Sequence, residues 1–243
     1  MKIYLTKKMT KKMYAFTCFF VLLLPIAAIF AKAYENRQVT RNPSKDSSET
    51  VIIDPGHGDP DGGAVGVDGV IEKNINLSLS CKLRDFFLTI GYTVIMTRED
   101  DSEIYDKESN TIRKKKVSDL RNRLEIINSH PDAIFVSIHQ NISKSPKSSG
   151  SMVIFSPNND LSNKLAQSIQ NSITKMLQPE NKRAVSPSAR TVYLLKNAKS
   201  PAVLVECGFL SNPADCKLLE DDSYQSKMAF SIFCGVLEFK SSA

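Results

Sequence analysis

The sequence predicts an α/β fold, a single mostly parallel sheet of six strands with helices on both faces. Short runs of apolar and β-branched residues alternate with longer amphipathic segments from Thr50 onward. The apolar runs are continuous, as is typical of parallel strands that are buried on both faces. Apolar residues make up 42% of the 243-residue chain, which is enough to fill one sizeable core.

Six apolar runs are predicted to be strands. In chain order they are residues 50–53, 92–97, 133–138, 152–155, 192–195 and 202–205. Pro55 and Gly56 end the first run and place His57 on the turn beyond it. His139 follows the third run and Glu206 follows the sixth in the same way. Because the carboxyl ends of parallel strands share one edge of a sheet, these three side chains are expected to meet there.

Amphipathic spacing predicts helices between and after the strands. Apolar residues recur at helical spacing within residues 75–90, 118–127, 161–177 and 224–239. Ser118 is the expected N-cap of the second helix, and Asn212 with Pro213 opens a further short one. The polar segment before Ser118 contains Arg113 to Lys116 and is expected to be a solvated loop. Contact with anionic glycan or with a protein partner is the alternative for this basic run.

The N-terminal residues carry the net charge of the chain. Residues 1–33 contain six lysines and no acid, and the rest of the chain has 26 basic and 26 acidic residues. A formally neutral remainder excludes nucleic-acid-binding proteins, which need a basic surface. Residues 13–31 form an uncharged, mostly apolar run behind five of the lysines, which indicates either a secretory signal or a membrane anchor.

This leader bears on where the protein works. Ala31-Lys32-Ala33 suits signal cleavage, whereas the 19-residue length of the apolar run favours an anchor, so both interpretations stay open. In either case the lysines remain on the cytoplasmic side and the N-terminal segment contacts the membrane. The rest of the chain then lies outside the cytoplasm. The polar residues 34–49 are expected to be a linker, and residues 50–243 the functional domain.

Four cysteines follow the leader, which itself contains Cys18. Cys81, Cys207, Cys216 and Cys234 could form two disulfides in an exported domain, but their spacing matches no small disulfide scaffold. Most of them lie in apolar helix or strand patterns. Buried free thiols are therefore the preferred interpretation.

The residues at the predicted sheet edge suit a catalytic metal. His57 and His139 supply imidazoles from two strands, and Glu72 supplies a carboxylate at the start of the helix that follows a Gly-rich loop. Two imidazoles and one carboxylate form the ligand set of a catalytic zinc that keeps one position open for water. Glu206 ends an apolar strand, where burial would raise its pKa toward that of a general base.

Each of these residues also has a purely structural interpretation. A single histidine at a strand end is usually hydrogen-bonded, Glu72 suits the N-terminal end of any helix, and Glu206 could pair with a buried arginine. Their equivalent places on the sheet favour a shared site over four coincidences. His130 lies beside Pro131 at a helix end and is expected at the surface.

Four motifs occur in order over residues 51–239. They are Asp54-Pro55-Gly56-His57-Gly58, Glu72-Lys73, Ser137-Ile138-His139-Gln140-Asn141, and PAVLVECGFLSN at 201–212. Together they resemble the zinc-dependent N-acetylmuramoyl-L-alanine amidases. The resemblance implies that His57, Glu72 and His139 bind one zinc ion and that Glu206 is the catalytic glutamate. Asn141 would orient a ligand or contact the substrate.

The same resemblance implies a substrate and a setting. The family hydrolyses the amide between N-acetylmuramic acid and the L-alanine of the peptidoglycan stem peptide. Residues 112–120 and 193–196 are similar to the germination-specific branch, the CwlD-like amidases of spore formers. That branch implies action on spore cortex on the route to muramic-δ-lactam, in the space around a developing spore. Access is often gated in this family, so a protein activator is an open alternative to an autonomous domain.

Two other functions are weighed against the amidase. A Cys/His hydrolase would use Cys207 with His139, but Cys207 lies within an apolar strand end and not at a helix N-terminus that would acidify a thiol. Loss of activity with a chelator but not with a thiol reagent would favour the metal enzyme. A non-catalytic wall-binding module needs no open metal site, so bound zinc would argue against it.

Overall fold

The computed structural model describes residues 50–242 of the chain. The leader and the linker expected within residues 1–49 lie outside the described part. Among the helices of residues 50–242, none is both long enough and apolar enough to cross a membrane.

The strands form one sheet in the order β2-β1-β3-β6-β4-β5. Their bounds are β1 Thr50–Pro55, β2 Thr93–Met96, β3 Ile134–Asn141, β4 Met152–Phe155, β5 Ser186–Pro187 and β6 Ala202–Phe209. β1 pairs in parallel with β2 and β3, and β3 pairs in parallel with β6. β4 is antiparallel to β6 and parallel to the two-residue β5. The predicted fold class, a mostly parallel six-stranded sheet, is confirmed.

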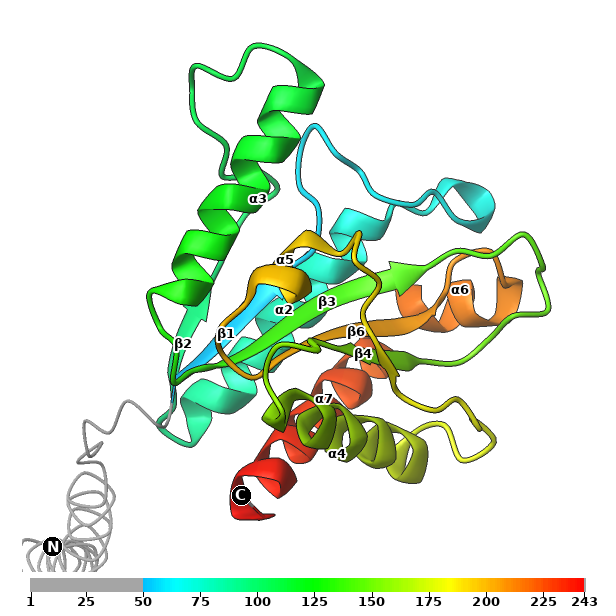
Figure 1. Ribbon diagram of the computed structural model, residues 1–243. Coiled ribbons are helices and arrows are strands. Elements are labelled where there is room, and N and C mark those ends of the chain that lie inside the picture. The colour runs from blue at the N-terminus through cyan, green and yellow to red at the C-terminus, as the bar shows by residue number, and fades with distance from the viewer. Residues whose placement is uncertain (1–49, 243) are drawn as a thin grey trace, which may run out of the picture. The chain divides into compact units, whose positions relative to one another are not determined.

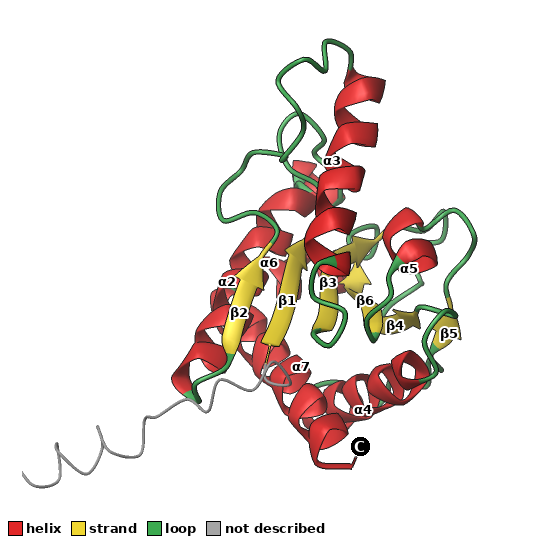
Figure 2. Cartoon of the chain, turned by 60° about the vertical axis from the view of Figure 1, so that its left-hand side comes forward, coloured by secondary structure: helices red, strands yellow, loops and turns green. Residues whose placement is uncertain are grey.

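Helices cover both faces of this sheet (Figures 1 and 2). Their bounds are α2 Glu72–Thr89, α3 Ile112–Asn128, α4 Leu161–Met176, α5 Tyr193–Asn197, α6 Pro213–Glu220 and α7 Asp222–Ser242, and a short 3-10 turn spans Val67–Gly69. The buried residues of α2, α4 and α7 share one apolar core, and those of α3 and α5 share another. Figure 2 shows these two groups of helices on opposite sides of the strands.

Side chains alternate between the two faces along each strand. On β3, Val136 and Ile138 belong to the core under α2, α4 and α7, whereas Phe135 belongs to the core under α3 and α5. On β6, Val205 lies in the first core and Leu204 in the second. By this alternation, residues 137, 139 and 206 face the side of the sheet that α3 and α5 cover.

Two predicted elements are wrong, and both lie on the α3 and α5 side. Residues 193–197 form helix α5 and not a strand, because one helical turn buries both Leu194 and Leu195 against β6 and β3. The basic run Arg113 to Lys116 is helical and not a loop, since α3 begins at Ile112 with Thr111 as its N-cap. Ser118, the expected cap, lies buried inside this helix.

Strand β5 at Ser186–Pro187 was not predicted, and the other elements agree with the prediction apart from their ends. β3 and β6 continue past their expected ends, so His139 and Glu206 lie within strands and not on turns beyond them. Asn212 caps α6 as predicted, accepting hydrogen bonds from the backbone of Ala214 and Asp215. The cysteines of the described residues are free thiols, and Cys207 and Cys216 are buried, whereas Cys81 and Cys234 are half-buried.

Candidate active site

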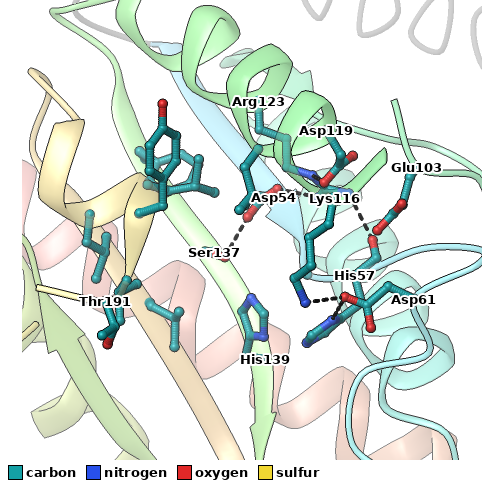
Figure 3. A pocket seen from close by; sticks show the side chains of 18 residues that line it. Asp54, His57, Asp61, Glu103, Lys116, Asp119, Arg123, Ser137, His139 and Thr191 are labelled. Carbon is teal, nitrogen blue, oxygen red and sulfur yellow. Dashed lines mark hydrogen bonds and ion pairs between the residues drawn. The ribbon is translucent and has the colours of Figure 1, made fainter. Parts of the chain in front are cut away.

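Buried polar contacts hold the carboxyl end of β1 (Figure 3). Asp54 accepts hydrogen bonds from Arg123 Nη1 at 2.7 Å, Ser137 Oγ at 2.6 Å and Thr97 Oγ1 at 2.7 Å. Arg123, which comes from α3, also donates to the carbonyl oxygen of His57 at 2.9 Å. His57 has a φ of 63°, a left-handed conformation that is uncommon outside glycine. The buried arginine therefore stabilises the turn that carries this histidine.

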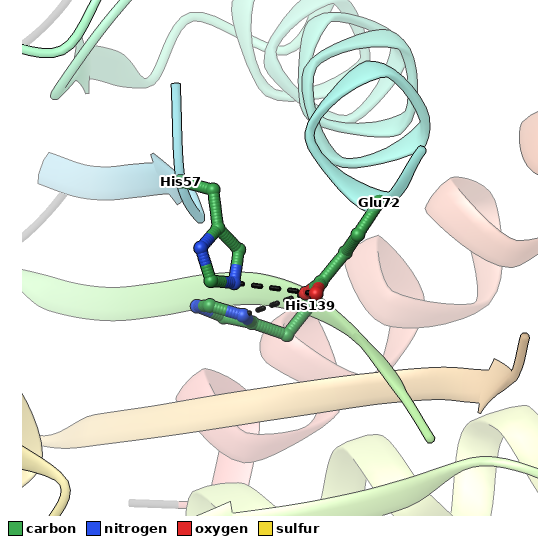
Figure 4. Close-up of side chains that lie close together, drawn as sticks. All are labelled: His57, Glu72 and His139. Atoms are coloured by element: carbon green, nitrogen blue, oxygen red, sulfur yellow. Dashed lines mark hydrogen bonds and ion pairs between the residues drawn. The ribbon is translucent and has the colours of Figure 1, made fainter. Parts of the chain in front are cut away.

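His57, Glu72 and His139 meet at the end of this turn (Figure 4). Glu72 Oε2 lies 3.2 Å from His57 Nε2, and Glu72 Oε1 lies 2.9 Å from His139 Nδ1. One candidate ligand atom from each residue lies within 4.8 Å of the others. The two imidazole rings stand edge to face, with their centroids 4.9 Å apart. The structure thus brings together the three residues that the sequence analysis proposes as metal ligands.

Glu72 is almost fully buried at the first turn of α2, and the backbone orients its carboxylate. Oε2 accepts a hydrogen bond from the amide of Ala64 at 2.7 Å, and Oε1 accepts one from the amide of Gln140 at 3.0 Å. Burial by itself would raise the pKa of this carboxyl. Hydrogen bonds with His139 and His57 outweigh burial and hold the pKa well below its ordinary range. The carboxylate is therefore ionised and already oriented toward both histidines.

Asp61, which the sequence analysis did not single out, lies on the other side of the His57 ring. Its Oδ2 is 3.1 Å from His57 Nδ1, and Nζ of Lys116 is 2.6 Å from the same oxygen. Burial lowers the pKa of His57, but hydrogen bonds with Asp61 and Glu72 outweigh burial and raise it to about 9. The surroundings of this imidazole therefore favour a positive charge.

Two glycines allow the side chains of the candidate metal ligands to approach the backbone. A Cβ on Gly56 would lie 2.2 Å from Nε2 of His139, and a Cβ on Gly63 would lie 2.6 Å from Oε2 of Glu72. Gly63 also has a φ of +72°, which residues with a side chain rarely adopt. The Gly-rich character of this loop thus follows from the space that the site requires.

Glu206 lies beside His139 on the same face of the sheet, because the two residues are paired in register between the parallel strands β3 and β6. The residue as a whole is half-buried, but its Oε2 is buried and has no hydrogen-bond partner within residues 50–242. Burial raises the pKa of this carboxyl to about 7. A carboxyl with such a pKa can accept a proton and return it near neutral pH.

The residues of this site fit a zinc ion by their chemistry and spacing. Two imidazole nitrogens and a carboxylate oxygen are the usual donors of a catalytic zinc site. Tetrahedral bonds of about 2.0–2.1 Å place neighbouring ligand atoms about 3.3 Å apart. The separation of 3.2 Å between His57 Nε2 and Glu72 Oε2 is of this size. A bound cation would also satisfy the negative charge around His57, and a water beside it would give Glu206 Oε2 a partner.

A pocket of about 280 Å³ opens beside the two histidines, between α3 and α5 (Figure 3). His57, His139, Asp61 and Lys116 line its polar end. Its apolar wall is formed by side chains from four elements, namely Leu120, Phe135, Leu194, Leu195 and Leu204. A concave apolar site with a few convergent polar groups is typical of ligand-binding pockets.

The other singled-out residues lie apart from this centre. Cys207 packs in the core under α2, α4 and α7, on the strand face opposite to Glu206, and burial raises the pKa of its thiol far above the ordinary value. This placement does not support a Cys/His hydrolase. His130 is exposed, as predicted, and its Nδ1 lies 3.0 Å from the carbonyl oxygen of Ile126. Asn141 is the last residue of β3.

Comparison with known proteins identifies the family. Residues 51–238 match the Amidase_3 family, described as N-acetylmuramoyl-L-alanine amidase. The chain is 36% identical over 193 residues to the germination-specific N-acetylmuramoyl-L-alanine amidase of Bacillus subtilis (strain 168), covering 79% of this chain and 80% of the relative.

Solved structures are similar over the same region. The CwlD amidase from Clostridioides difficile, solved in complex with the GerS lipoprotein, has a TM-score of 0.77 and 41% identity, covering 80% of this chain and 100% of that one. The amidase AmiC2 of Nostoc punctiforme has a TM-score of 0.68 and 28% identity, covering 80% of this chain and 98% of that one. The chain belongs to the N-acetylmuramoyl-L-alanine amidase family and is a hydrolase of that class.

Proposed function

We propose that the chain is a zinc-dependent amidase that hydrolyses the bond between N-acetylmuramic acid and the L-alanine of the stem peptide in peptidoglycan. The observation that carries this proposal is the meeting of His57, Glu72 and His139 beside Glu206, whose Oε2 has no hydrogen-bond partner among residues 50–242. Family membership supports the class of bond, and the donor set supports zinc as the metal.

The proposed roles follow from where each group lies. His57, Glu72 and His139 would hold the zinc, which supplies Lewis acidity that polarises the scissile carbonyl and acidifies the attacking water. Glu206 accepts the proton of that water through Oε2 as the oxygen attacks the carbonyl carbon. The C–N bond then breaks, and Glu206 returns the proton to the alanine nitrogen, leaving a free carboxylate on the lactyl group. The pocket between α3 and α5, which His57 and His139 line, provides room for substrate.

Substitution of the proposed base tests this mechanism. Glu206→Gln keeps the shape of the side chain but cannot accept the proton, so the rate of muropeptide cleavage should fall about 100- to 10,000-fold. Zinc content should remain at that of the wild type, because Glu206 is not a proposed ligand. Glu180→Gln, which alters an exposed glutamate that does not line the pocket, is the matched control. Substantial turnover by Glu206→Gln would remove its assigned role.

A role in spore cortex is the finer proposal. It is supported by similarity to the germination-specific amidase of Bacillus subtilis and to the CwlD amidase of Clostridioides difficile. Cleavage of stem peptides from muramic acid exposes the carboxylate from which muramic-δ-lactam forms. Cells that carry Glu206→Gln as their sole copy should therefore lack muramic-δ-lactam among their cortex muropeptides. Unchanged lactam content in these cells would contradict the spore role but not the amidase activity.

The proposal extends to location and partners. Residues 1–33 would export or anchor the chain, residues 34–49 would link it to the catalytic domain at 50–243, and catalysis would occur outside the cytoplasm. Because the Clostridioides difficile relative was solved with a lipoprotein, a protein partner is included in the proposal. Alkaline phosphatase fused after residue 243, which becomes active only outside the cytoplasm, should be active, and an inactive fusion would contradict this location. Full cleavage by the purified chain alone would contradict the need for a partner.

A further inference from the structure

Asp61 is held in place by its own loop and faces His57. Its Oδ1 accepts a hydrogen bond from the amide of Gly63 at 3.0 Å, and its carbonyl oxygen accepts one from the amide of Gly58 at 3.0 Å. These contacts leave Oδ2 directed at Nδ1 of His57, 3.1 Å away. The opposite nitrogen of the same ring, Nε2, faces Glu72 at 3.2 Å.

This contact decides which nitrogen of His57 would keep its proton when the ring binds a metal. An ionised carboxylate can only accept a hydrogen bond, so Nδ1 carries the proton that it donates to Asp61. Nε2 also faces a carboxylate, that of Glu72, so the proton on Nε2 is the one that zinc would replace, and the lone pair of Nε2 would then bind the metal. A carboxylate behind a metal-bound histidine fixes the orientation of the ring and increases its basicity as a ligand.

Lys116 connects the same carboxylate to helix α3. Its Nζ lies 2.6 Å from Oδ2 of Asp61, the oxygen that also contacts His57 (Figure 3). Lys116 belongs to the basic run of α3, and half of its side chain is exposed. The side chain of nearby Lys114 instead donates a hydrogen bond to Asn110 at the same helix end. The ammonium group keeps the Asp61 carboxylate at the back of the ring and balances its charge.

We propose that Asp61 is a positioning residue for the metal site and that Lys116 couples the position of α3 to metal affinity through Asp61. This inference rests on the proposed function, because it assigns the two residues a role toward the zinc that His57 would bind. It also gives a role to Lys116, which is the last residue of the basic run from Arg113 to Lys116. The chain Lys116–Asp61–His57 passes from a surface helix to the first metal ligand in two contacts.

Loss of the Asp61 or Lys116 side chain should weaken zinc binding and leave the stability of the zinc-free fold unchanged. An ion pair with a half-exposed lysine contributes little to folding. Its effect on a histidine ligand is different, because loss of a carboxylate behind such a ligand weakens metal binding about 10- to 100-fold. Metal affinity and the melting temperature of the zinc-free protein therefore distinguish positioning from a structural role.

The experiment uses the purified full-length chain, with zinc affinity measured by competition with a chromophoric chelator. Asp61→Ala should bind zinc about 10- to 100-fold more weakly than the wild type. Lys116→Met should bind zinc about 2- to 5-fold more weakly, and Lys116→Arg, which retains the charge, should bind as the wild type does. Lys114→Met is the matched control and should have no effect. Melting temperatures of the zinc-free variants should equal that of the wild type.

The double variant tests the route. If Lys116 acts through Asp61, adding Lys116→Met to Asp61→Ala should cause no further loss of zinc affinity. Wild-type affinity in both single variants would overturn the inference while leaving the proposed function intact. A lowered melting temperature of zinc-free Asp61→Ala would also overturn it, because the role would then be structural. A wild-type chain that binds no zinc would overturn the inference and the proposed function together.

Discussion

The two faces of the sheet differ in what they bury. Under α2, α4 and α7 the core is continuous and apolar, and side chains such as Phe87 and Val236 are fully buried. Under α3 and α5 a smaller apolar cluster adjoins buried ion pairs of Arg123 with Asp54 and Asp119, and the pocket opens beside them. The first face buries apolar side chains throughout. The second face buries fewer apolar side chains and holds polar groups in fixed positions.

The alternation of strand side chains keeps these two tasks separate. β3 directs Val136 and Ile138 to the apolar core, and it directs Ser137 and His139 to the polar face. Glu206 follows the same rule on β6, opposite to its neighbours. The two faces therefore predict two kinds of response to substitution, one in stability and one in chemistry.

The largest expected effect is on the apolar face. Phe87→Ala removes a fully buried ring that packs against Phe233, and it should lower the free energy of unfolding by about 3–5 kcal/mol. Cleavage rate per folded molecule should be unchanged. Chemical denaturation measures the unfolding free energy, and a muropeptide assay measures the cleavage rate. Leu88→Ala, at an exposed neighbouring position, is the control. A loss of turnover in folded Phe87→Ala would show that the faces are coupled.

A pH-dependent effect comes next, on the polar face. Burial raises the pKa of Asp54, but the charge of Arg123 and hydrogen bonds from Ser137 and Thr97 outweigh burial and lower it below the ordinary value of 3.8. Since the pKa is lower in the folded state than in the unfolded state, this carboxylate stabilises the fold above about pH 4, and the contribution is lost as pH falls further. Asp54→Asn should cost roughly 3 kcal/mol at pH 7.

Unfolding measured at several pH values tests this assignment. The difference in unfolding free energy between the wild type and Asp54→Asn should narrow as pH falls below about 4, because the carboxyl then binds a proton in the unfolded state while it stays ionised in the folded state down to its lower pKa. Asp132→Asn, at an exposed position, should differ little from the wild type at any pH. A constant difference between the wild type and Asp54→Asn across the acid range would contradict a buried, ionised Asp54.

A smaller change is expected where the backbone meets the site. Gly56→Ala places a Cβ within 2.2 Å of the His139 ring, so the imidazole must move. A displacement of about 1 Å at a reacting centre costs on the order of 100-fold in rate. Gly62→Ala in the same loop, whose Cβ would meet only an Ile71 methyl at 3.3 Å, is the control. Equal cleavage rates for Gly56→Ala and Gly62→Ala would contradict the claim that a Cβ on Gly56 displaces the His139 imidazole.

The smallest effect is predicted for the thiol. Cys207→Ala should leave the cleavage rate unchanged, because Cys207 faces the apolar core and burial keeps its thiol protonated. A thiol reagent should likewise leave the rate of the wild type unchanged, whereas a zinc chelator should abolish it. Inactivation by the thiol reagent, absent from Cys207→Ala, would revive the cysteine mechanism.

The sequence was informative where local pattern decides structure. Residues 50–53 are β-branched and apolar, and Pro55-Gly56 ends the strand, so the place of His57 on the sheet edge could be predicted. The fourth strand, 152–155, was predicted with its observed bounds. These features depend on neighbours along the chain.

The two wrongly predicted elements lie on the α3 and α5 face of the sheet. On this face, contacts between residues far apart in the sequence determine the local structure. α5 is helical although its run resembles a strand, since burial of Leu194 and Leu195 overrides local preference. Arg123 bonds to a carbonyl 66 residues away, and Lys116 to a carboxylate 55 residues away. Spacing in the sequence does not reveal such pairs, so the residues that support the site were missed, although the three residues proposed as metal ligands were singled out and lie together.

X-ray absorption spectroscopy of the zinc-loaded full-length chain tests the central claim most directly, because it reports which atoms surround the metal. Zinc held by His57, Glu72 and His139 should give only nitrogen and oxygen scatterers at about 2.0–2.2 Å, with the outer-shell pattern of two imidazoles. His139→Ala should remove one imidazole from that pattern. A sulfur scatterer near about 2.3 Å, or a spectrum unchanged in His139→Ala, would contradict the site described for this protein.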